Sequence, residues 1–167
     1  MLKQQEEPVT LKPLSKSHIK QMVAWGEDGE TNHLLGVNET ADYWVRCRTL
    51  LGQPNHRLWA IMVGQDRLIG EVKLTQISWR TREAELMVFI GNPNYRGKGF
   101  GSKVVKKVLA QAFVVLKLRR VYLRVYQYNA RAVRCYLRCG FKKEGVLRNR
   151  YRFGGQNRDI YLMYIES

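Results

Sequence analysis

The sequence has few prolines, few acidic side chains and no long apolar run. Its four prolines form no linker, and no internal repeat is visible, so the 167 residues predict a single domain, 1–167, with a sizeable core. The longest apolar runs, 109–116 and 86–90, are too short to cross a bilayer. The N-terminus has no apolar core of a signal peptide, which predicts a cytoplasmic protein with no membrane partner.

Cysteine is also scarce. Cys47, Cys135 and Cys139 fit a reducing compartment. Cys135 and Cys139 lie four residues apart on one face of an expected helix, but no histidine or further cysteine supplies the remaining ligands of a zinc site. We therefore expect buried free thiols and no metal.

The shortage of acidic residues leaves a strongly basic chain. Lys and Arg number 29 against 14 Asp and Glu, a net charge of +15. Such a surplus favours polyanionic partners: nucleic acid, a ribosome, an acidic protein or a phosphorylated cofactor. The basic residues are spread along the chain, so a solvated basic surface is an equal alternative.

Apolar periodicity predicts the order of strands and helices. We expect strands at 9–14, 57–63, 68–78, 83–90, 121–126, 141–153 and 158–165, and helices at 15–25, 40–51, 102–118 and 129–139. The inner stripe of the longest helix is expected to be Val104, Val105, Val108, Ala112 and Val115. This order predicts an α/β (α+β-like) fold, a mixed sheet with helices on both faces.

A basic glycine-rich turn separates the strand 83–90 from the long helix. Gly97, Gly99 and Gly101 let the backbone approach a bulky anion, and Arg96 and Lys98 add positive charge. The N–H groups that open a helix are free and lie at the positive end of its dipole. The turn therefore predicts a binding site for a phosphorylated ligand.

Two nucleotide-binding signatures do not fit this turn. A P-loop needs Lys followed by Ser or Thr after its last glycine, whereas here Ser102 precedes Lys103. A Rossmann fingerprint needs G-x-G-x-x-G at the first strand and an acidic residue about 20 positions later, and this chain has G-x-G-x-G in mid-chain with no acid at 118–124.

Two motifs in this chain resemble those of the GNAT superfamily of acetyl-CoA-dependent N-acetyltransferases. The segment 96–101 has the form R-x-x-G-x-G, which is similar to the family's diphosphate-binding signature. The segment 129–141 is similar to its N-x-x-A-x-x-x-Y-x-x-x-G-F block, with Asn129, Ala132, Tyr136, Gly140 and Phe141 in place. The resemblance implies a GNAT-type fold with a central, mostly antiparallel sheet of about seven strands.

The resemblance also implies a reaction and its residues. Acetyl-CoA would be the co-substrate, and an amine would attack it directly in a ternary complex without a metal. The backbone of Phe89 and Ile90 would bind the pantetheine arm, with the Phe89 N–H aimed at the thioester oxygen. Contacts to the carrier would also come from Arg96, Gly97, Lys98, Gly99, Phe100, Gly101 and Asn129, although Asn129 could simply cap its helix.

The catalytic assignments follow the same resemblance. Tyr136 would protonate the departing thiolate. Glu85 is the candidate base, and Glu83 on the same strand face or a water molecule are alternatives. The histidines His18, His33 and His56 have no expected duty. The aromatic residues Trp25, Trp44, Trp59, Trp79 and Tyr151 could line the acceptor groove, although most are expected in the core.

The amine acceptor stays open between a protein N-terminus and a small molecule. Leu68-Ile69-Gly70 and the later segment 83–86 resemble the branch that includes ribosomal-protein and polyamine acetyltransferases. The net charge of +15 argues mildly against a polyamine or an aminoglycoside, and mildly for an acidic or ribosomal partner. A homodimer is left open. The alternatives are a basic nucleic-acid- or ribosome-binding module and a non-catalytic CoA-binding regulator.

Overall fold

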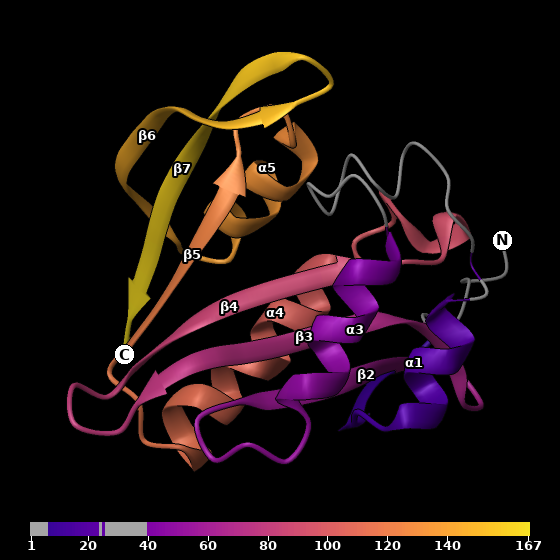
Figure 1. Cartoon of the computed structure of the whole chain (residues 1–167). Helices are drawn as coiled ribbons and strands as arrows, with labels where there is room; N and C mark the ends of the chain where they lie inside the picture. The colour runs from indigo at the N-terminus through magenta and orange to yellow at the C-terminus, as the bar shows by residue number, and fades with distance from the viewer. Residues whose placement is uncertain (1–6, 24, 26–39) are drawn as a thin grey trace, which may run out of the picture.

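The computed structural model describes residues 7–23, 25 and 40–167 (Figure 1). Every predicted strand and helix is present within a few residues of its expected bounds. The strands are β1 Val9–Pro13, β2 Arg57–Val63, β3 Arg67–Ser78, β4 Glu83–Ile90, β5 Arg120–Tyr126, β6 Lys142–Phe153 and β7 Gln156–Glu166. The α-helices are α1 Lys16–Val23, α3 Thr40–Leu50, α4 Phe100–Ala110 and α5 Ala130–Arg138.

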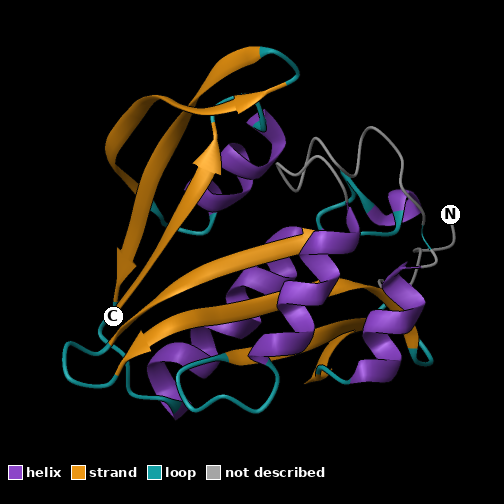
Figure 2. Ribbon diagram, in the orientation of Figure 1, coloured by secondary structure: helices purple, strands orange, loops and turns teal. Residues whose placement is uncertain are grey.

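The strands form one sheet in the order β1-β2-β3-β4-β5-β7-β6, antiparallel except between β4 and β5. Helices α1 and α3 cover one face, while α4 lies on the other (Figure 2). Alternation along β2 shows the division, because Ile61 joins the core under α4 and α5, and Ala60 joins the core under α1 and α3. The predicted mixed, mostly antiparallel sheet of about seven strands is confirmed.

The two halves of the sheet separate between β4 and β5. Their pairing covers only Glu83 to Glu85 against Arg120 to Tyr122. Beyond this point the strands diverge into a V (Figure 1), and β5 continues beside β7 as far as Tyr126. Among the residues that the structure describes, the last part of β4 has no ladder partner on that side, so backbone groups there can pair with a ligand.

The long helix differs from the prediction at both ends. It begins at Phe100, and after Ala110 it widens into a π-helical turn, Gln111–Val115, in which the Leu116 N–H donates to the Gln111 carbonyl at 2.9 Å. The wider turn directs Val115 outward, where it is 61% exposed, and brings Leu118 into the core. Val115 was therefore wrongly predicted as buried; the other four residues of the expected stripe are fully buried.

Candidate active site

The glycine turn leaves the first amides of α4 without a side-chain cap. Gly97 and Gly99 have φ of 70° and 85°, the left-handed region that favours glycine. Gly99 is the N-cap of α4 and supplies no capping side chain. The N–H groups that follow it lie at the positive end of the helix. This geometry fits a diphosphate, as the sequence predicted.

Arg96 is occupied with the protein backbone. Its Nε donates to the Ile90 carbonyl at 2.7 Å and its Nη2 to the Gly91 carbonyl at 3.0 Å. The guanidinium also lies 5.8 Å from the centre of the Phe89 ring. These contacts tie the glycine turn to the end of β4, and the predicted role of Arg96 toward the phosphates of the carrier stays a prediction.

A cavity of about 450 Å³ lies between the end of β4, the glycine turn and the helices α4 and α5. Most of the predicted carrier-binding residues line it. They are Phe89 and Ile90 of β4, Arg96, Gly97 and Gly99 of the turn, Gly101 in the first turn of α4, and Asn129 at the start of α5. Lys98 and Phe100 do not line it, and the Phe100 ring packs on Tyr95 with centroids 5.3 Å apart. A role for the backbone amides of these two residues in binding the carrier stays a prediction.

Asn129 and Tyr136 belong to the α5 wall of the cavity. Asn129 caps the helix, because its Oδ1 accepts from the Ala132 N–H at 3.2 Å. Tyr136 is 7% exposed, and its hydroxyl has no hydrogen-bond partner within the described residues. Burial raises the pKa of the Tyr136 phenol above its usual value, so it keeps its proton at neutral pH. A protonated phenol facing the cavity is suited to donate that proton.

Glu85 is buried on β4 but does not line this cavity. Arg124 binds both of its oxygens, with Nε to Oε1 at 2.8 Å and Nη2 to Oε2 at 3.2 Å, and Gln76 adds a bond to Oε2 at 3.3 Å. The hydrogen bond to Glu85 raises the pKa of Arg124. The alternative, Glu83, lies 4.0 Å from Arg120. The geometry therefore offers no free carboxylate at either position, and the base stays a prediction.

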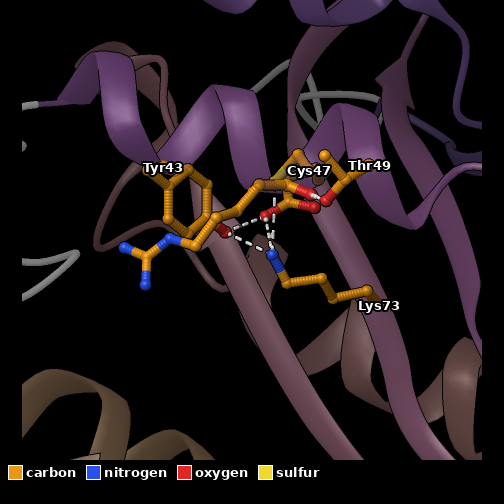
Figure 3. Close-up of polar contacts among 6 residues, drawn as sticks. Tyr43, Cys47, Thr49 and Lys73 are labelled. Carbon is orange, nitrogen blue, oxygen red and sulfur yellow. Dashed lines mark hydrogen bonds and ion pairs between the residues drawn. The ribbon is translucent and has the colours of Figure 1, made fainter.

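A buried polar network on the α3 side of the sheet was not singled out from the sequence (Figure 3). The Lys73 ammonium lies 2.9 Å from the Tyr43 hydroxyl, 3.3 Å from the Cys47 sulfur and 3.3 Å from Glu71 Oε1, and Tyr43 donates to the same oxygen of Glu71. The Glu71 side chain is fully buried and that of Lys73 is 4% exposed. The sequence signal for this network was the presence of two charged residues, Glu71 and Lys73, in a strand that is otherwise largely apolar.

The network shifts the acidity of its members. Burial and the Glu71 charge raise the pKa of Tyr43, and the same two causes raise the pKa of Cys47 to about 11. Burial alone would lower the pKa of Lys73, but Glu71 and Cys47 reverse that effect and raise it. Lys73 and Glu71, both on β3, therefore form a buried ion pair, and their contacts with Tyr43 and Cys47 tie β3 to α3.

His18 and His56 do not line the cavity. His18 Nδ1 is 3.0 Å from the Ser15 hydroxyl, and His56 accepts from the Gln76 N–H at 3.3 Å. His33 and the side chain of Tyr151 lie outside the described residues. All three cysteines are free, as predicted, but Cys135 and Cys139 are only half-buried.

Of the expected groove aromatics, Trp25 and Trp44 lie beside the end of β4. A Cβ added to Gly91 would lie 2.2 Å from the Trp25 ring. Trp44 is buried in the core, Trp59 packs against the core on the other face, and Trp79 is 47% exposed. Among residues 7–23, 25 and 40–167 there is no cluster of three metal-ligating side chains. No helix in that part of the chain is long and apolar enough to span a membrane.

Comparisons with known proteins agree with this geometry. A family model described as an acetyltransferase (GNAT) domain matches residues 9–142. The chain is 36% identical over 109 residues to a spermidine N(1)-acetyltransferase of Vibrio cholerae, covering 65% of this chain and 62% of that protein. It is 35% identical over 96 residues to the Escherichia coli K12 enzyme of the same name, covering 58% of this chain and 51% of the relative.

The similarity in three dimensions is more extensive. A crystal structure of Vibrio cholerae spermidine N-acetyltransferase in complex with CoA and spermine superposes with a TM-score of 0.84 at 26% identity. That superposition covers 95% of both chains. By sequence, in contrast, the matched segments span about half to three-fifths of these curated relatives.

Proposed function

The chain belongs to the GNAT acetyltransferase family, and from that premise we propose that it transfers the acetyl group of acetyl-CoA to a primary amine. The observation that carries the proposal is that the uncapped start of α4 and Tyr136 line the same cavity. The start of α4 fits a diphosphate, and Tyr136 presents a proton donor. The carrier supplies a thioester, which is an acyl group already activated for transfer.

The glycine turn holds the carrier in this proposal. Free N–H groups at the start of α4 bind the diphosphate, and the positive φ of Gly97 and Gly99 allows the backbone to approach it. Arg96 keeps the turn fixed against the Ile90 and Gly91 carbonyls. The residues are therefore arranged before the carrier binds, which lowers the entropy lost on binding.

The diverging end of β4 positions the reacting carbonyl. Phe89 and Ile90 lie beyond the last β4–β5 pair and line the cavity. The Phe89 N–H donates to the thioester oxygen and stabilises the negative charge that develops there when the amine attacks. This role requires only the backbone, so the Phe89 ring can still serve the core beside Tyr43 and Trp44.

Tyr136 completes the transfer. The amine nitrogen forms a bond to the carbonyl carbon, the tetrahedral intermediate breaks its C–S bond, and the departing thiolate takes the proton of the Tyr136 phenol. The amine must lose a proton before or during attack. Glu85, Glu83 or water takes it, and the ion pairs of both carboxylates favour water.

We propose a small polycationic amine as the acceptor. The relatives named above are spermidine acetyltransferases, and one solved neighbour holds spermine. Although the whole chain carries +15, the segment 21–45 contains no Lys or Arg and five acidic residues: Glu27, Asp28, Glu30, Glu39 and Asp42. The net charge had argued mildly against a polyamine, and this uneven distribution removes that objection.

The described residues at the two ends of that acidic segment lie beside the proposed reaction centre. Trp25 packs on Gly91 at the end of β4. At the other end, the rings of Tyr43 and Trp44 lie 6.3 Å and 6.1 Å from the Phe89 ring.

A cytoplasmic location belongs to the same proposal, because free thiols fit a reducing compartment. A homodimer and an acidic or ribosomal partner stay predictions.

Thiol release from acetyl-CoA, measured with spermidine, spermine, an aminoglycoside and an N-terminal peptide, tests the proposal. We expect turnover with the polyamines and a fall in kcat of about 10²-fold or more for Tyr136→Phe, with acetyl-CoA affinity within about 3-fold of wild type. Tyr164→Phe on β7, outside the cavity, is the matched control and should keep its rate. An unchanged rate for Tyr136→Phe removes the phenol from the mechanism.

The same measurements separate the alternatives. A CoA-binding regulator would bind acetyl-CoA in calorimetry and release no thiol with any amine. A nucleic-acid-binding module would show strongly salt-dependent binding to RNA or DNA and no heat with acetyl-CoA.

A further inference from the structure

Three arginines of α5 line the cavity and have no partner among the residues that the structure describes. Arg131, Arg134 and Arg138 all contribute to its wall, and all three are exposed. Within the described part of the chain, none of them has a hydrogen bond or an ion pair. Arg124 and Arg120, in contrast, are held by carboxylates at 2.8 Å and 2.6 Å. The α5 arginines therefore leave three positive charges available beside a cavity.

The three side chains form one row. Spacings of three and four residues place them on the same face of the helix, over roughly 10 Å of its length. The row begins at the glycine turn, because the guanidinium carbon of Arg131 lies 3.7 Å from the position of a Cβ on Gly97. Small residues on the same wall, Ala132 and Cys135, leave space in front of the row.

The diphosphate does not account for this row. The amides at the start of α4 already face that group, and Arg131 is the only one of the three arginines with a contact to Gly97, the glycine of the turn that it adjoins. Arg134 and Arg138 lie one and two helical turns farther on. CoA carries a further phosphate, a monoester on the ribose 3′ oxygen, and a guanidinium binds such a dianion through two parallel N–H donors.

We propose that Arg134 and Arg138 form a subsite for the 3′-phosphate of the carrier and make the protein select acetyl-CoA over its 3′-dephospho form. The inference rests on the proposed use of acetyl-CoA. A merely solvated basic surface would place its arginines independently of the cavity, whereas both of these line it. A nucleic-acid footprint predicts instead that RNA competes with CoA.

The test is calorimetric titration with CoA and with 3′-dephospho-CoA, which requires no turnover. The proteins are wild type, the double variant Arg134→Gln/Arg138→Gln, and Arg80→Gln. Arg80 is an exposed arginine in the turn before β4, at the end of that strand opposite the cavity, so it is a control for loss of charge.

We expect wild type to bind CoA about 10- to 100-fold more tightly than dephospho-CoA. The double variant should reduce that preference to about 3-fold or less by losing affinity for CoA, with its affinity for dephospho-CoA little changed. Arg80→Gln should keep the full preference. Acetyl transfer can fail while this preference is present, so the two proposals fail separately.

Equal binding of the two carriers by wild type overturns the subsite. A preference for CoA that survives in the double variant also overturns it. The same holds if RNA competes with CoA and the double variant abolishes this competition while the preference for CoA remains.

Discussion

The two faces of the sheet differ in how far their positively charged side chains are paired with carboxylates. On the α1 and α3 face, Lys73 and Arg124 are each paired with a buried carboxylate, Glu71 and Glu85. On the α4 and α5 face, three arginines have no partner in the described residues and line a cavity beside an uncapped helix start: Arg131, Arg134 and Arg138. Paired charges hold elements together, whereas unpaired charges around a cavity favour an anionic ligand.

Breaking a pair on the α3 face should produce the largest loss of stability. Lys73→Met leaves the fully buried Glu71 carboxylate without its cation, and we expect the free energy of unfolding to fall by about 3–5 kcal/mol. Denaturant unfolding followed by circular dichroism measures the change. Lys73→Met/Glu71→Gln, which removes both charges, is the control and should recover most of the loss. A single variant as stable as wild type would contradict the account.

Removing the hydrogen bonds of Arg96 on the cavity side should weaken binding of the carrier more than it lowers stability. Arg96→Gln removes the donors to the Ile90 and Gly91 carbonyls, so we expect acetyl-CoA binding to weaken by about 10-fold. Lys98→Gln, whose side chain does not line the cavity, should change affinity by about 3-fold or less. Calorimetry with acetyl-CoA compares them. An equal loss for the two variants would favour a simple charge effect over a fixed turn.

The pH dependence of stability offers the smallest and most specific test of the α3 face. Burial and Glu71 raise the pKa of Cys47 from 9.0 to about 11. Between these values the unfolded thiol loses its proton while the folded one keeps it, so the contribution is complete below pH 9 and is lost as the pH rises through about 11. We expect a decrease of up to about 1.4 kcal/mol per pH unit in that window.

Cys47→Ala should remove this part of the slope, whatever it does to stability at neutral pH. The measurement is the free energy of unfolding at several pH values from 8 to about 11 for both proteins. Parallel curves would show that Cys47 does not titrate as its burial predicts.

The sequence predicts the elements and the cavity residues because both are local signals. Apolar periodicity locates the strands and helices, and the spacing of Gly97, Gly99 and Gly101 marks a turn that opens a helix. The Asn129 cap is equally local, since donor and acceptor are three residues apart. Such features depend on neighbours in the chain, so they can be read without the fold.

The contacts that separate the two faces depend on tertiary structure. Glu71 and Lys73 are buried because α3 covers them, and Arg124 reaches Glu85 because the beginnings of β4 and β5 lie side by side. Arg134 lines the cavity because of the position that α5 takes beside the diverging strands. The π-helical turn that exposes Val115 is likewise invisible in a helical pattern.

Titration of the purified chain with acetyl-CoA, comparing wild type with Gly99→Ala, tests the central claim most directly. Gly99 has φ of 85° at the start of α4, and a Cβ there meets no atom within 4 Å, so the substitution strains the turn without blocking the cavity. We predict saturable heat at one site per chain for wild type and at least about 10-fold weaker binding for the variant. No heat from wild type, or identical binding by both proteins, would contradict the account.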